Sequence, residues 1–195
     1  SIAASVAVVL EFDDSREILL HTRSHETVTY GGMRAVIHYF GMAPMGETRT
    51  LRAKEQWRTL PNDVLVEANI IKEYCEELFS YDDLILDANF KMLNPNWLWA
   101  KPQARDLRDL LNARKAELRC LGFGFDGLNG SATLSFLLLI KDHNASHAIA
   151  QGISGNWEVD STPNSQGSIE LVPLRHETVD PLFDARVFSY GSAFT

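Results

Sequence analysis

The stretch IIKEYCEELFS (residues 70–80) places Glu73, Glu76 and Glu77 within five consecutive positions. If the stretch is helical, these side chains are neighbours on its surface. Like charges three or four residues apart then repel each other, at a cost of a few tenths of a kcal/mol per pair. Two interpretations are open: the carboxylates form a solvated helix face, or they are gathered to hold a cation.

The residues around this stretch follow the periodicity of a helix. Apolar side chains recur at spacings of four, three, four and three residues, at Val64, Ala68, Ile71, Cys75 and Leu78. Such a stripe is typical of a helix that packs one face against a core. The spacing predicts a helix over residues 64–79, with core contacts through Ile71, Cys75 and Leu78.

Segments rich in β-branched and apolar residues predict strands on both sides of this helix. They are residues 5–12 and 17–21, which form a hairpin, followed by 27–30, 34–40, 119–125, 133–140 and 168–173. A second helix is predicted over residues 104–118, and a short final helix from His176. Strands outnumber helices and their order is mixed, so we expect an α/β fold with a mixed sheet.

The size and charge of the chain limit its organisation and its partners. The 195 residues, 45% hydrophobic and 23% charged, predict a single globular domain over residues 1–195. A net charge of −8 argues against a protein that grips nucleic-acid phosphates. It does not exclude a phosphate-bearing small molecule that is met through a bound divalent cation.

The location of the protein is predicted from two further features. The apolar run over residues 136–140 is far too short to cross a membrane. The two cysteines, Cys75 and Cys120, are too few for a disulfide framework, and reduced thiols are expected. We therefore predict a cytoplasmic protein without a membrane span.

The predicted strand over residues 34–40 leads directly into GMAPMGET (residues 41–48), where Glu47 follows Gly41 after five residues. A glycine lets the chain turn tightly at the end of a strand. A carboxylate beyond that turn can be directed back toward the helix that follows. Together with Lys72 and the three helix glutamates, this pattern resembles the signature of the Nudix hydrolases. That signature reads Gly, five residues, Glu, seven residues, then Arg-Glu, two residues and Glu-Glu.

The sequence departs from the family signature in its middle and at its end. Twenty-four residues separate Glu47 from Lys72 where the family has seven, which corresponds to a 17-residue insertion. Lys72 stands in place of arginine, and Phe79 in place of the glycine near the end of the helix. Lengthening a loop costs little free energy, so we expect residues 48–62 to form a surface insertion. Such an insertion is compatible with a lid or with a contact in a homodimer.

The resemblance implies a Nudix-like mixed β-sheet sandwiched between helices, and metal-assisted cleavage of a phosphoanhydride. Mg²⁺ or Mn²⁺ would be held by Glu73, Glu76 and Glu77, because these hard ions prefer carboxylate oxygens. Lys72 would orient a carboxylate, and Glu47 would complete the catalytic group. The candidate substrate-binding residues are Arg23, Gly41, Phe125 and Glu158.

The resemblance leaves two functions open. The first is hydrolysis of a nucleoside diphosphate linked to another group. The second is an inactive Nudix-like domain that binds a nucleotide or metabolite as a sensor or regulatory module; the insertion, Lys72 and Phe79 favour it. The substrate cannot be deduced from the signature, because specificity lies in variable loops.

Other chemically capable residues have simpler interpretations. Two histidine pairs have the four-residue spacing that can bind zinc on a helix, namely His21 with His25 and His143 with His147. Both pairs are predicted to lie at turn-like strand ends without a third ligand, so a structural role is expected. Trp97 and Trp99 could form an aromatic wall for a ring or could pack in the core. Core packing is the simpler alternative.

Overall fold

The described part of the chain consists of one β-sheet with helices packed against it. The computed structural model describes residues 2–22, 34–36, 39–41, 66–81, 97–126, 131–154 and 169–183. The elements, in chain order, are β1 (Ile2–Glu11), β2 (Arg16–Thr22), β3 (Arg34–Val36), β4 (Tyr39–Gly41), α1 (Val66–Phe79), α2 (Trp97–Ala100), α3 (Pro102–Asn112), β5 (Ala116–Asp126), β6 (Ser131–Ile140), α4 (His143–Gly152), β7 (Glu170–Pro173), α5 (His176–Val179) and the 3₁₀ helix η2 (Asp180–Phe183).

The sheet is mixed, as predicted. Its strand order is β3-β2-β1-β6-β5, with β4 also paired to β1 and β7 to β2. The pair β1–β6 is parallel, with Val8 opposite Leu138, and the other pairs are antiparallel. The predicted hairpin of β1 and β2, the late strand β7 and the short helix α5 are all present.

The central strand β1 is apolar on both faces, which explains its continuous run of small and β-branched residues. Val6, Val8 and Leu10 belong to the main core, on the side of the helices. Ala7 points the other way and packs with Leu20 in a second cluster. A strand that is buried on both faces shows an unbroken hydrophobic run instead of an alternating one.

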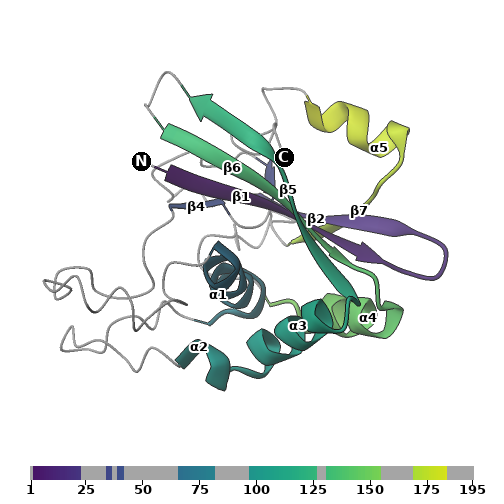
Figure 1. Cartoon of the computed structure of the whole chain (residues 1–195). Coiled ribbons are helices and arrows are strands. Elements are labelled where there is room, and N and C mark those ends of the chain that lie inside the picture. Colours follow the sequence, from purple (N-terminus) through teal and green to yellow (C-terminus); the bar gives the residue numbers. More distant parts are fainter. Residues whose placement is uncertain are drawn as a thin grey trace, which may run out of the picture.

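Helices α1, α3 and α4 lie on one face of the sheet, below the strands in Figure 1, and the short helix α2 packs beside α3. Helix α3 contacts α1 and β5, and α4 contacts β1 and β6. Helix α5 follows β7 and lies apart from this layer (Figure 1). None of the helices in the described ranges is long and apolar enough to cross a membrane.

The bounds of most predicted elements differ by a few residues from those in the structure, and two elements differ more. The strand predicted over residues 34–40 is two short strands, because β3 pairs with β2 whereas β4 pairs with β1. Strand propensity reports a fit to a pleated surface and does not select the partner. The helix predicted over residues 104–118 is α3, which begins at Pro102 and ends at Asn112. Arg114 adopts a left-handed conformation (φ 58°) that stops the helix, and β5 begins two residues later.

Helix α4 is an element that the sequence analysis missed, because residues 143–147 were predicted to lie at a strand end. The carboxylate of Asp142 caps it by accepting a hydrogen bond from the Ala145 amide at 2.9 Å. An aspartate at this position is a common start signal for a helix. The predicted strand over residues 27–30 and the insertion over residues 48–62 lie outside the described residues.

Candidate functional site

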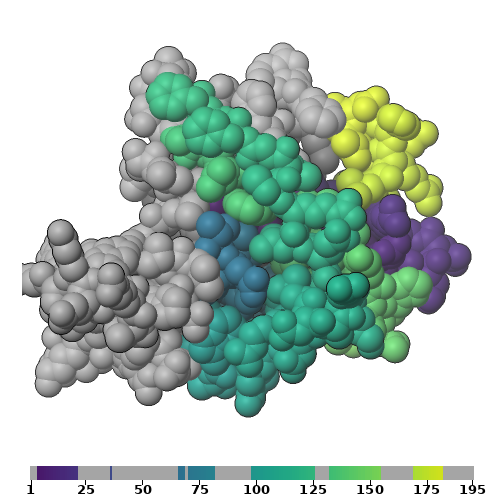
Figure 2. Space-filling view, viewed as in Figure 1, coloured from purple at the N-terminus to yellow at the C-terminus, as the bar shows by residue number. Residues whose placement is uncertain are grey.

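Helix α1 carries the three glutamates, and it is buried on nearly all sides. Ile71, Cys75 and Leu78 are fully buried in the main core, as the apolar stripe predicted. Glu76 and Glu77 are also buried, and Glu73 is partly buried. In Figure 2 only a small area of α1 is visible, in blue beside the teal segments. The interpretation of the glutamates as a solvated helix face is therefore wrong.

Lys72 lies among these carboxylates and binds two of them. Its Nζ is 2.6 Å from Oε2 of Glu76, one helical turn further along, and 3.0 Å from Oε1 of Glu73. The side chains of Lys72 and Glu76 are each 9% exposed, and that of Glu73 is 17% exposed. The expectation that Lys72 contacts a glutamate of this helix agrees with this geometry, and the ammonium group bridges two carboxylates.

Two opposing effects act on the pKa of Lys72. Burial lowers the pKa, because the charged form loses hydration. The carboxylates of Glu73 and Glu76 raise it through charge attraction and hydrogen bonds, and the net pKa lies above the usual value for lysine. Lys72 is therefore positively charged at every physiological pH.

Tyr74 and Cys75, which lie between Glu73 and Glu76 on α1, are uncharged at physiological pH. Burial raises the pKa of the Cys75 thiol to about 12, and nearby Glu76 raises it further, against a lowering effect of Lys101. Burial likewise raises the pKa of the Tyr74 hydroxyl. Cys75 is thus a protonated, inert core thiol and does not take part in chemistry.

The carboxylates suit a hard divalent cation in their chemistry, since Mg²⁺ and Mn²⁺ prefer oxygen ligands. The arrangement of the described carboxylates, however, does not by itself form a metal site. Within the described ranges, no group of three or more His, Cys, Asp or Glu side chains is placed so that it could hold a metal ion. Glu47, the carboxylate expected from the loop before the helix, lies outside the described residues, as do Arg23 and Glu158.

The other predicted site residues lie on strands. Gly41 is the last residue of β4 and pairs with Ala3 of β1. Phe125 lies on β5, the last strand of the sheet order, and is 64% exposed. The structure brings together Lys72, Glu73 and Glu76, whereas Gly41 and Phe125 belong to other elements.

His143 and His147 have structural contacts, as expected, although they lie on a helix, and His25 lies outside the described residues. His143 and His147 are on α4, where Nδ1 of His143 is 2.8 Å from Oδ1 of Asp13. The ring of His147 packs at 4.9 Å from that of Phe12. Both contacts attach α4 to the end of the β1–β2 hairpin. His21 is buried in β2.

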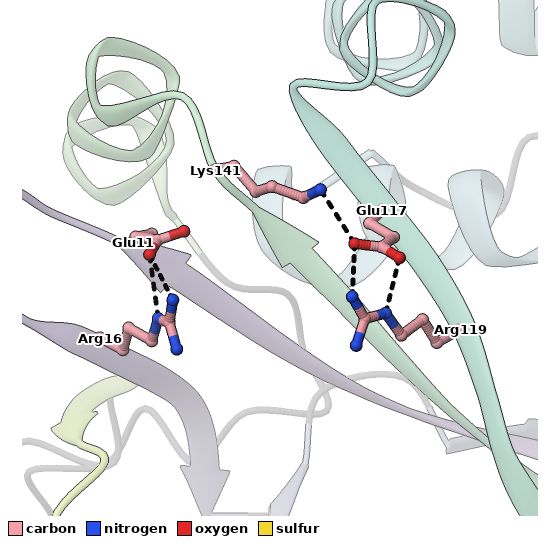
Figure 3. Close-up of polar contacts among 5 residues, drawn as sticks. All are labelled: Glu11, Arg16, Glu117, Arg119 and Lys141. Carbon is pink, nitrogen blue, oxygen red and sulfur yellow. Dashed lines mark hydrogen bonds and ion pairs between the residues drawn. The ribbon is translucent and has the colours of Figure 1, made fainter.

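A group of exposed ion pairs lies at the end of the sheet where β1 and β6 finish (Figure 3). Arg16 binds Oε1 of Glu11, its register partner across the hairpin, through Nη2 at 2.6 Å and Nε at 3.0 Å. Glu117 on β5 binds both Arg119 (2.6 Å) and Lys141 (2.9 Å). Hydrogen bonds from Arg119 and Lys141 lower the pKa of Glu117 to about 2. These solvent-exposed pairs contribute little to stability and do not form a pocket.

The comparisons with known proteins give similarity in structure only. No protein-family model matches the sequence, and no curated protein matches it significantly. The chain is similar to the Nudix domain of NrtR from Shewanella oneidensis, solved with ADP ribose, with 11% identity and a TM-score of 0.41 over 89% of this chain and 72% of that one. A MutT/nudix family protein from Enterococcus faecalis has 9% identity and a TM-score of 0.42, over 89% of this chain and 43% of that one. A NUDIX hydrolase from Alicyclobacillus acidocaldarius has 13% identity and a TM-score of 0.39, over 98% and 87% of the two chains. All three are structures of Nudix proteins, the family whose signature the sequence resembles.

Proposed function

We propose that the chain is a Mg²⁺- or Mn²⁺-dependent hydrolase that cleaves the phosphoanhydride of a nucleoside diphosphate linked to another group. The observation that carries this proposal is the burial of the acidic residues of α1. Glu76 and Glu77 are buried and Glu73 is partly buried on one helix, and Lys72 contacts Glu73 and Glu76. Carboxylate oxygens are the ligands that Mg²⁺ and Mn²⁺ prefer, so this helix supplies the kind of side chain that such a cation requires.

The side chains of the helix have separate roles in this proposal. Lys72 fixes the carboxylates of Glu73 and Glu76 through its two short contacts, so that they keep one orientation. Glu76 and Glu77 supply oxygens toward the cation, and Glu47 and Glu158 are proposed as further acidic residues of the site. A bound divalent ion would supply charge neutralisation for a diphosphate and a water of lowered pKa. Arg23, Gly41 and Phe125 remain proposed substrate contacts.

A second function is favoured by one specific observation. Lys72 already binds two of the three carboxylates, and the described residues do not gather three metal ligands. An ammonium group in this position can replace part of the charge that a metal ion would bring. The alternative is therefore a domain that binds a nucleotide or metabolite as a sensor and does not hydrolyse it.

We propose that residues 1–195 form one domain and that the protein is cytoplasmic. Cys75 and Cys120 are both free thiols, which fits a reducing compartment. The partner is a small molecule of nucleotide type, and contact between two copies of the chain stays compatible with the insertion over residues 48–62.

Melting temperatures with and without Mg²⁺ or Mn²⁺ test the proposal in the parent protein and in the variants Glu76→Gln and Glu77→Gln. The matched control is Glu67→Gln, because Glu67 is an exposed carboxylate on the same helix. We expect the metal to raise the melting temperature of the parent and the control, and to have little effect on the other two variants. Formation of nucleoside monophosphate from a panel of nucleoside diphosphate derivatives should then fall by about 10-fold or more in the same two variants.

Each outcome selects one function. A metal response together with hydrolysis supports the enzyme. Nucleotide binding without a metal response and without hydrolysis supports the sensor. A parent that responds to neither metal nor nucleotide would contradict both.

A further inference from the structure

A cavity lies in the helix layer, between α1, α3 and α4. Its volume is about 590 Å³, within the range of pockets that hold small organic ligands. Tyr74 and Phe79 of α1 form one wall, and α3 contributes Asp106, Asp109 and Leu110. Helix α4 forms the third side with Ala148 and its neighbours.

The cavity is separate from the acidic site of α1. Tyr74 is two residues from both Lys72 and Glu76, which places it about 160° round the helix from each of them. Neither Lys72 nor any of the three glutamates lines the cavity. A ligand in the cavity would therefore contact the opposite side of α1 from the Lys72–Glu76 pair.

The walls combine apolar and aromatic surface with negative charge. The rings of Tyr74 and Phe79 meet edge to face at 5.3 Å. Leu107, Leu110 and Ile149 add aliphatic surface. The carboxylates of Asp106 and Asp109 are exposed at the edge, and neither makes an ion pair or side-chain hydrogen bond with another residue of the described ranges.

The other polar residues of the cavity have internal partners. Lys115 lines it as well, but its Nζ is 2.8 Å from Oδ2 of Asp142. Gln103 accepts a hydrogen bond of 2.6 Å from the Tyr81 hydroxyl. The charge that the cavity presents to a ligand is therefore that of Asp106 and Asp109.

We propose that this cavity binds a small organic cation, with an apolar or aromatic body between α3 and α4 and an amine or ammonium group beside Asp106 and Asp109. The apolar walls match the body, and a cation is attracted both by the carboxylates and by the faces of aromatic rings. This site is independent of the hydrolase proposal, because it uses none of the same residues.

Three probes of one shape test the proposal: phenyltrimethylammonium, the neutral tert-butylbenzene and the anionic benzenesulfonate. Amide chemical shifts of the full chain are followed by NMR during each titration. We expect the cation to bind with a dissociation constant of about 1 mM or lower, as is usual for a fragment of this size. The shifts should centre on α3 and α4, and the anion should not bind.

Two sets of variants locate the site. The double variant with Asp106→Asn and Asp109→Asn should bind the cation about fivefold more weakly, as expected for the loss of two partly exposed charge contacts. Its affinity for the neutral probe should be unchanged. The control removes the same charge elsewhere, with Asp14→Asn and Glu177→Gln, two exposed residues that do not line the cavity. It should leave all three affinities unchanged.

Filling the cavity gives the second test. Ala148→Phe should abolish binding of the cationic and the neutral probe, whereas Gln151→Phe, on the same helix but outside the cavity lining, should not. The proposal is overturned if the three probes bind equally, if the double asparagine variant keeps its affinity for the cation, or if the shifts map to another face. The asparagine variants keep the test decisive should Ala148→Phe not fold.

Discussion

Replacing Lys72 with methionine should destabilise the protein strongly, because it removes one partner of a buried ion pair. Methionine keeps the length and apolar character of the side chain but lacks the ammonium group. Glu76, whose carboxylate is 2.6 Å from that group, would then stay buried without this cation, and Glu73 would lose its contact at 3.0 Å. Removing one member of a buried pair typically costs about 3–5 kcal/mol.

The magnitude can be expressed as a measurable change. A loss of about 3–5 kcal/mol is a large part of the total stability of a typical domain, about 5–15 kcal/mol. For a chain of this size each kcal/mol lowers the melting temperature by about 2–4 °C, so a decrease of about 6–20 °C is expected. The ion pair is fully formed near neutral pH. Because the folded-state pKa of Lys72 is raised, its contribution is complete below the unfolded-state pKa and is lost as the pH rises through the folded-state pKa.

Urea unfolding near neutral pH, followed by tryptophan fluorescence, measures the effect. Arg16→Met is the matched control, because Arg16 makes equally short contacts with Glu11 but its side chain is 60% exposed. That exposed pair should contribute about 1 kcal/mol or less. If Lys72→Met costs no more than Arg16→Met, the burial of the Lys72 cluster has been misjudged and the physical basis of the proposed site is lost.

The variant Lys72→Met also tests whether the acidic residues of α1 bind Mg²⁺. If the acidic residues of α1 hold Mg²⁺ with a dissociation constant of about 1 mM, about 10 mM Mg²⁺ should stabilise the folded state by about 1.4 kcal/mol. In Lys72→Met the response should be larger than in the parent, because the competing ammonium group is gone. An unchanged or smaller response in the variant would show that Lys72 and the metal do not share these carboxylates.

Three further outcomes are expected. Ile71→Ala should lower the free energy of unfolding by about 2–5 kcal/mol, because Ile71 is fully buried in the main core. A loss below about 1 kcal/mol in urea unfolding would contradict its core position. A thiol reagent should modify only Cys120 in the folded protein and both cysteines in denaturant. The reason is that Cys120 is exposed, whereas Cys75 is buried and burial raises its pKa to about 12. Rapid modification of two thiols in the native state would refute this. The carboxyl group of Glu117 should titrate near pH 2 by NMR, and in Arg119→Met its pKa should rise toward the usual value for glutamate. A normal pKa in the parent would show that the pairs of Glu117 with Arg119 and Lys141 in Figure 3 do not form in solution.

The sequence predicted those parts of the fold whose signal is local. The hairpin, the helix with its apolar stripe and the mixed class followed from periodicity, and Ile71 and Cys75 lie in the core as expected. The division of residues 34–40 into two strands did not follow, because the choice between β1 and β2 as partner depends on the whole sheet. Helix α4 was missed although Asp142, its capping residue, was visible in the sequence.

The candidate site was predicted in part. Periodicity placed Lys72 and the glutamates on one helix, and the resemblance to the Nudix signature implied that Lys72 contacts a carboxylate; the structure shows contacts with Glu73 and Glu76. The cavity between α1, α3 and α4 could not be predicted, because Tyr74, Asp106 and Ala148 are far apart along the chain and have no common motif. It depends on the packing of three helices, which no local pattern records.

The clustering of glutamates on α1 has two interpretations from the sequence, a solvated helix face or a cation site. The burial of Glu76 and Glu77 excludes the first. Glu76 and Glu77 are too little exposed to be stabilised by water alone, so their charge has to be met from within the protein or by a bound ion. Lys72 meets part of it, and it does so as a compact charge that can move away from Glu76 more easily than a bidentate arginine could. Under the proposed function, a lysine at this position would hold the carboxylates in place when no metal is bound and would release Glu76 to a cation that binds. On this argument Lys72→Arg should preserve stability but weaken the response to Mg²⁺, because the guanidinium fork would hold its carboxylates more firmly.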